Sequence, residues 1–115
     1  MRTTFDIKLL VVPQRLSMSQ RRTFQAGLEA VNRGETAIDP ELSRTTLTVD
    51  GRPSEAWDRV VKESPRDAPW RTLPPDQRLS IWWSLGERMF DGPGRYQLVL
   101  KLGDRESIAE VEVTE

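Results

Sequence analysis

The sequence predicts an all-β domain, a sandwich of about seven antiparallel strands that spans residues 1–115. Apolar side chains recur at every second position in most segments, which is the period of a half-buried strand. Turn-forming residues, such as Asp50-Gly51 and Gly103-Asp104, separate these segments at the spacing of a small sandwich. The composition, 37% hydrophobic and 30% charged residues in a chain of 115, suits one domain with a single core.

Three strands are expected in the first half of the chain, at residues 5–11, 24–30 and 45–49. Pro13 ends the first of them, and the polar and basic residues 14–22 are expected to form a connection. The third strand leads into Asp50-Gly51, a strong signal for a hairpin turn. Pro53 follows at once, so the partner strand of that hairpin is predicted to be weak.

Residues 52–77 predict either a short helix or a strand, together with a long Pro-rich loop. Ser54 is a favourable N-cap for a helix over Glu55–Lys62, although a strand carrying Trp57 fits the same residues. Repeated prolines then disfavour regular structure up to about residue 77. A segment of this kind is often a functional loop or a cover over the sandwich.

The final third of the chain has the clearest alternation, with strands expected at residues 79–85, 96–102 and 108–113. Trp82 and Trp83 are adjacent, so on a strand their side chains point to opposite faces. Trp83 shares its phase with Ile81 and other apolar residues, which predicts that Trp83 faces the core and Trp82 faces outward.

The segment Pro93–Leu98 resembles the tyrosine corner of immunoglobulin-like domains, in which a Tyr follows a Gly by two positions. This resemblance implies an immunoglobulin-like sandwich. It also implies that the Tyr96 hydroxyl caps a backbone group near the preceding turn, and that Leu98 occupies the place of a cysteine in antibody domains.

A wider pattern, over residues 23–113, is similar to bacterial immunoglobulin-like modules, including the intracellular proteinase inhibitors of the BsuPI family. The matching pieces are Leu28–Gly34, Val49–Arg52 with Trp57 shortly after, Leu73–Gln77 before the strand with Trp83, and the Gly-x-Tyr motif. The family usually has Pro-Gly-Glu where this chain has Pro75-Asp76-Gln77. The resemblance implies a fold and suggests protease inhibition, but it carries over no reactive-site residue.

Composition argues against several classes of function. The chain has no Cys and no His, which excludes disulfides, thiolate metal sites and His-dependent catalysis, and no Ser-x-x-Lys motif is present. Glu110 and Glu112 are the only close carboxylate pair with matched facing, and a solvated strand face explains them better than acid–base chemistry. We therefore expect no enzymatic activity, cofactor or metal.

The net charge and its distribution along the chain also limit the partners that we expect. The net charge is −1, and Arg21-Arg22 is too short a basic cluster for nucleic acid. Basic residues outnumber acidic ones in 1–34, and acidic residues outnumber basic ones in 104–115. This predicts opposite charges paired across neighbouring strands, or alternatively a bipolar surface for a charged partner. No membrane insertion and no signal peptide are expected. The compartment stays open between the cytoplasm and, after removal of a signal, the periplasm or exterior.

Tryptophans are the candidate binding residues: Trp82, Trp70 and Trp57. An outward Trp82 is either covered by the Pro-rich segment or left for a partner. The main hypothesis is a non-enzymatic module that binds a protein partner through Trp82 and the 52–77 segment, with protease inhibition as one version. The alternative is a carbohydrate-binding accessory domain in which Trp82 and Trp70 stack on sugar rings.

Overall fold

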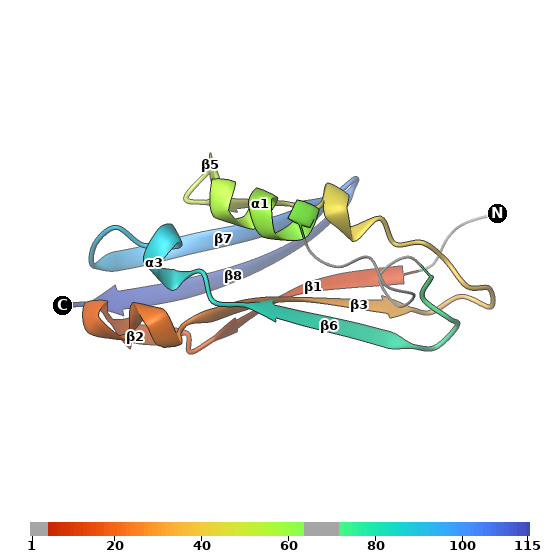
Figure 1. The fold of residues 1–115 in the computed structure, drawn as a ribbon, viewed down its shortest axis with the longest axis horizontal. Helices are drawn as coiled ribbons and strands as arrows, with labels where there is room; N and C mark the ends of the chain where they lie inside the picture. The colour runs from red at the N-terminus through yellow and green to blue at the C-terminus, as the bar shows by residue number, and fades with distance from the viewer. Residues whose placement is uncertain (1–4, 64–71) are drawn as a thin grey trace.

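The structure is a computed structural model that describes residues 5–63 and 72–115. It is β-rich, with a three-stranded sheet in the order β1-β3-β6 and a five-stranded sheet in the order β2-β8-β7-β4-β5 (Figure 1). The strands are β1 (Phe5–Val12), β2 (Arg15–Ser17), β3 (Gln25–Asn32), β4 (Thr46–Val49), β5 (Arg52–Pro53), β6 (Arg78–Trp83), β7 (Gly94–Leu102) and β8 (Arg105–Thr114). The helical elements are α1 (Glu55–Glu63), α3 (Gly86–Met89) and the 3-10 turns η1 (Met18–Thr23) and η2 (Leu42–Arg44).

The strands with strong alternation lie where the sequence predicts them, but the expectation of purely antiparallel pairing is wrong. Within the segment expected to be a connection, β2 pairs in parallel with β8, and Arg15 lies 3.5 Å from Glu112. This ion pair confirms that basic and acidic ends of the chain meet across neighbouring strands. The pairing is not visible locally because β2 has only three residues and its partner is near the other end of the chain.

The ambiguous segment after β5 forms helix α1, not a strand. Ser54 caps the helix as predicted, since its Oγ accepts a hydrogen bond of 3.2 Å from the backbone N–H of Trp57. The strand expected at residues 79–85 ends at Trp83, and α3 follows. Gly86 allows α3 to lie against η1, because a Cβ at Gly86 would be 2.2 Å from the carbonyl oxygen of Arg21.

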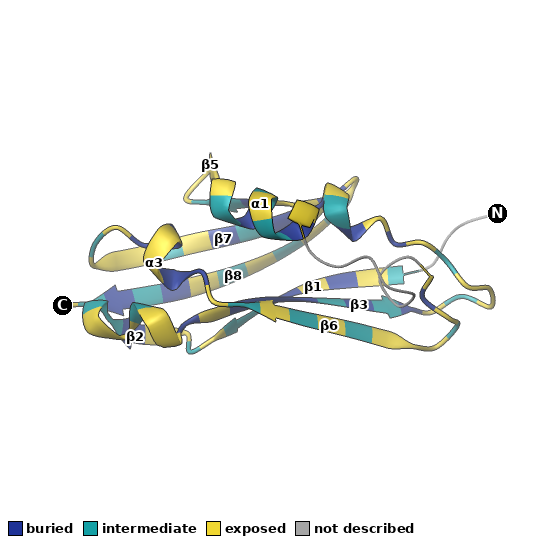
Figure 2. Ribbon diagram, viewed as in Figure 1, coloured by how far each residue is buried: buried dark blue, intermediate teal, exposed yellow. Residues whose placement is uncertain are grey.

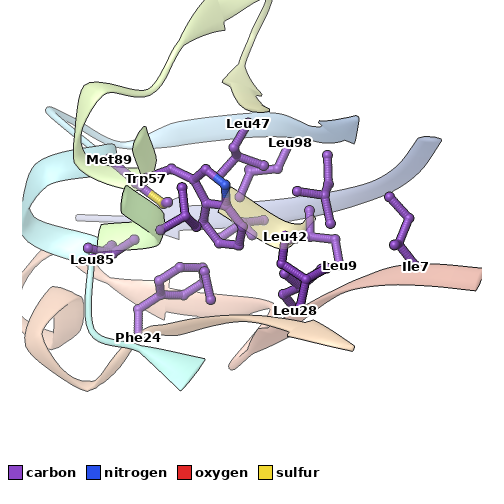
Figure 3. Close-up of a cluster of buried hydrophobic side chains, with 14 of the residues drawn as sticks. Ile7, Leu9, Phe24, Leu28, Leu42, Leu47, Trp57, Leu85, Met89 and Leu98 are labelled. Carbon is purple, nitrogen blue, oxygen red and sulfur yellow. The ribbon is translucent and has the colours of Figure 1, made fainter. Parts of the chain in front are cut away.

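One hydrophobic core lies between the two sheets, and alternate residues of each long strand supply it (Figures 2 and 3). Figure 3 shows the Trp57 indole in the middle of this core, with Leu47 and Leu98 on one side and Phe24 on the other. Trp57 is fully buried, and its Nε1 donates a hydrogen bond of 3.1 Å to Oγ1 of Thr45. The helix therefore contributes the largest side chain of the core.

Polar side chains join the sheets along the edge of β1. The backbone N–H of Leu9 donates a hydrogen bond of 2.9 Å to Oγ of Ser107 on β8. Farther along, Nε of Arg105 donates to the carbonyl of Phe5 at 2.9 Å, and its guanidinium lies 4.0 Å from the centre of the Phe5 ring. Side chains of β8 thus satisfy backbone groups that β1 would otherwise leave unpaired.

The predicted hydrogen bond between the Tyr96 hydroxyl and the backbone of the preceding turn is present. The Tyr96 hydroxyl donates to the carbonyl of Gly92 at 2.6 Å and accepts from the Gly92 N–H at 3.3 Å. The Tyr96 ring packs against Phe90, with ring centres 4.8 Å apart. The side chain therefore ties the turn before β7 to the core.

Replacing Tyr96 by Phe should lower the free energy of unfolding by about 1 kcal/mol or more, because the hydroxyl contact is lost and backbone groups of Gly92 lose their partner. Urea denaturation followed by Trp fluorescence measures this difference. Ser84→Ala removes an exposed hydroxyl outside the strands and serves as the control, with an expected change near zero. Equal stability of Tyr96→Phe and the wild type would show that the contact between the Tyr96 hydroxyl and Gly92 contributes nothing.

Candidate functional site

The outer face of the three-stranded sheet carries a group of apolar side chains. Trp82 on β6 is 40% exposed, and Val12 on β1 is 56% exposed. Leu10, Gly27 and Trp82 lie in one row across the sheet, since Leu10 pairs with Gly27 and Gly27 pairs with Trp82. Alternation places Leu10, Val12 and Trp82 on the same side, away from the core. We call this set, with Gly27 between its members, the Trp82 face.

Gly27 determines where the indole lies. A Cβ on Gly27 would come within 2.8 Å of both Cδ2 and Cε3 of Trp82, so the ring covers the glycine backbone. Any side chain at this position would have to displace the ring or the strand. Gly27 is buried beneath the indole, which gives Trp82 a defined position on the sheet while it remains 40% exposed.

Charged residues border the Trp82 face. The next row along the sheet contains Lys8, Glu29 and Ser80, and Glu29 lies 3.8 Å from Arg78. Asp6, one row farther, forms an ion pair with Arg33. An apolar centre with a polar rim is the usual anatomy of a protein-binding surface.

The structure describes two of the three tryptophans named from the sequence, and it places them on different sides of β6. Trp82 faces outward, as predicted. Trp57 is a correction: its side chain is 0% exposed and packs edge-on against Trp83, with ring centres 5.1 Å apart, so it offers no surface to a partner. Because Trp83 faces the core, Trp57 and Trp82 lie on opposite sides of β6. Trp70 lies outside the described residues.

Sequence reasoning named Trp82 but not its neighbours. Asp6, Lys8, Leu10 and Val12 are the outward-facing positions of the first strand. The change from polar to apolar residues along these positions is visible in the sequence. Their proximity to Trp82 depends on β3 lying between β1 and β6. The order of strands in the sheet is not encoded by alternation, so the row could not be assembled beforehand.

A concave region lies at the five-stranded sheet. It is an open groove of about 610 Å³ between the β4–β5 turn, the start of α1 and α3, and Asp50, Arg52, Glu55 and Arg59 are among its lining residues. Both signs of charge line it, and Trp82 is not part of it. Residues 52–56 and Arg59 therefore line a different surface from Trp82. Across residues 5–63 and 72–115, the structure has no group of three or more metal-ligating side chains and no helix suited to crossing a membrane.

Gly27→Ala should displace the Trp82 indole and lower the free energy of unfolding by about 1–3 kcal/mol through overpacking. The cost should be smaller when Trp82→Ala is already present, because the ring atoms that the new methyl group meets are gone. Chemical denaturation of the two single variants and the double variant measures this coupling. Equal costs of Gly27→Ala in both backgrounds would contradict the contact between Gly27 and Trp82.

Comparison with known proteins identifies a shared fold but no family. No protein-family model and no curated protein matches the sequence. Among solved structures, a β-glucosidase from Erythrobacter marinus superposes with a TM-score of 0.58 at 13% identity, covering 97% of this chain and 16% of that one. A β-glucosidase from Listeria innocua superposes with a TM-score of 0.51 at 10% identity, over 98% and 16% of the two chains. The chain thus has the fold of a small part of these larger proteins.

Proposed function

We propose that the chain is a non-enzymatic module that binds another protein through the Trp82 face. The observation that carries the proposal is a Trp that is 40% exposed and lies over Gly27, on the same face as Leu10 and the 56% exposed Val12. Large apolar side chains are normally covered in a folded protein, and Trp is among the residues that dominate binding energy at interfaces.

The position of the indole favours recognition. The Gly27 contact restricts the ring, so less side-chain entropy is lost when a partner packs on it. Charged residues at the border, such as Lys8 and Glu29, supply polar groups for specificity around an apolar centre. The chain's fold also recurs within longer proteins, which agrees with a role as a binding unit.

We propose further that the fold is of the immunoglobulin-like type, with Tyr96 as the tyrosine corner. The two hydrogen bonds between the Tyr96 hydroxyl and Gly92 support this assignment. Protease inhibition, which the BsuPI resemblance suggests, is one form that protein binding would take. Incubation with a panel of serine, cysteine, aspartic and metalloproteases tests it, and unaltered activity of every class would exclude that form.

Trp82→Ala should abolish the recovery of specific partners when the immobilised chain is exposed to an extract of the source organism. Truncation of a central Trp at an interface removes about 2 kcal/mol or more, which weakens binding at least about thirtyfold. Ile108→Ala is the matched control, because Ile108 is 54% exposed on the other sheet and its removal should leave recovery unchanged. Identical recovery with wild type and Trp82→Ala would reject the proposal that a different protein binds through this face.

Carbohydrate binding is the second candidate, favoured by the same exposed indole, since a Trp ring also stacks on sugars. If it is correct, oligosaccharides should quench or shift Trp fluorescence in the wild type and not in Trp82→Ala. The comparison isolates Trp82 from the buried Trp57 and the other tryptophans. No response of the wild type across a glycan panel would exclude this function.

A further inference from the structure

The edge strands of the two sheets differ in how far they are protected from pairing with a strand of another chain. β2 and β5 are edge strands of three and two residues, and β5 contains Pro53. β1 is longer, but Ser107 and Arg105 bond its backbone at Leu9 and Phe5. β6, with six residues, is the remaining edge, and it has neither a proline nor a bulge in its pairing with β3. Long unprotected edges pair readily with another strand.

The register identifies which backbone groups of β6 point away from the sheet. The N–H of Asn32 donates to the carbonyl of Gln77 at 3.1 Å, so the bonded positions on β6 continue at every second residue, at Leu79, Ile81 and Trp83. The N–H and C=O groups of Arg78, Ser80 and Trp82 therefore face the free edge. Within the part of the chain that the structure describes, no backbone hydrogen bond is made by these three residues on that side.

The opposite edge of the sheet gives the same result independently. The groups of β1 that reach Ser107 and Arg105 belong to the odd residues Leu9 and Phe5, so the even residues of β1 bond to β3. The alternate residues of β3, which include Ala26 and Leu28, must then bond to β6 through Trp83 and Ile81. Both edges thus assign Arg78, Ser80 and Trp82 to the open side.

We propose that a second copy of this chain pairs with β6 in antiparallel orientation, with the two-fold axis at Ser80. This proposal rests on the proposed function, because it names a partner for the surface that contains Trp82. In this register Ser80 faces Ser80 of the second copy, and Arg78 faces Trp82 of the second copy. Each of these pairs exchanges two backbone hydrogen bonds, so every open group of the three residues is satisfied in both copies.

The side chains of β6 are self-complementary in this register. On the outer face, the guanidinium of Arg78 lies beside the exposed indole of the other copy's Trp82, within reach of a cation–π contact. On the inner face, Leu79 lies opposite Ile81 of the second copy, and both residues are only half-buried in one chain. A two-fold axis repeats each favourable pair, as an interface between identical chains requires.

The interface is small, so the dimer is expected to form at high protein concentration. Sedimentation equilibrium of the full chain from micromolar to millimolar concentration should show a monomer that converts to a species of twice the mass. Ser80→Pro should weaken this dimer about tenfold or more, because two backbone hydrogen bonds across the axis are lost. A proline with its nitrogen on the open side of an edge strand is compatible with the fold.

Ser80→Ala is the matched control, since it keeps the backbone N–H and should dimerise like the wild type. Trp82→Ala should also weaken the dimer, through loss of the contact with Arg78. A circular dichroism spectrum and thermal midpoint close to those of the wild type establish that Ser80→Pro is folded. A dimer that Ser80→Pro and Trp82→Ala leave unchanged would overturn the proposal.

A second measurement does not depend on the proline variant. The chain contains no cysteine, so Ser80→Cys introduces a single thiol next to the proposed axis. A short bismaleimide should join two such chains efficiently, whereas Gln97→Cys, exposed on the other sheet, should give little product. Equal cross-linking of the two variants would overturn the proposal.

The results separate this proposal from the proposed function. A wild type that stays monomeric at millimolar concentration overturns dimerisation through β6. If Trp82→Ala still abolishes recovery of a different protein in that case, the Trp82 face remains a binding surface. If the chain dimerises through β6 and Trp82→Ala recovers every partner that the wild type recovers, the second copy is the partner of this surface.

Discussion

Burial of the Trp57 indole between the sheets is the contact on which the rest of the fold depends. The strands form two separate sheets, and no strand pairing joins one sheet to the other. Beside α1, side chains must therefore set the distance between the two sheets. Trp57 does so from helix α1, contacting Trp83 of the three-stranded sheet and Thr45 beside β4 of the five-stranded sheet. A fully buried indole with its N–H satisfied contributes a large apolar area with no unpaired polar group.

Where β1 and β8 lie together, hydrogen bonds from side chains hold the two sheets to each other. There, Ser107 and Arg105 on β8 bond the backbone of β1, so polar contacts replace an apolar wedge. Asn32, fully buried at the end of β3, similarly satisfies loop carbonyls at Thr36 and Leu73. Each of these contacts gives a hydrogen-bond partner to a backbone group that no strand pairing satisfies.

The exposed surface follows from the core. Contact with Trp57 keeps Trp83 on the inner side of β6, and the strand geometry then places Trp82 outside. Gly27 allows the indole to lie close to the sheet, and Leu10 and Val12 extend the apolar surface from β1. The same strand also carries the open backbone groups of the sheet edge. A binding face and an edge for pairing therefore meet on β6, which is why one residue, Trp82, enters both proposals.

The sequence by itself determined the features that depend on near neighbours in the chain. Period-two alternation located the long strands and the opposite orientations of Trp82 and Trp83. Ser54 indicated the helix α1 as one of two alternatives, and the resemblance of Pro93–Leu98 to a tyrosine corner implied that the Tyr96 hydroxyl caps a backbone group near the preceding turn. Each of these signals acts within a few residues, so it can be read without knowing the fold.

Only the tertiary structure decided which distant segments meet. It paired β2 with β8, buried Trp57 instead of exposing it, and brought Leu10 and Trp82 together across Gly27. These outcomes depend on strand order and on packing between sheets, which alternation along one strand does not specify. The candidate site was therefore predictable as a residue, Trp82, and not as a surface, because its other members are gathered by pairing between strands far apart in the chain.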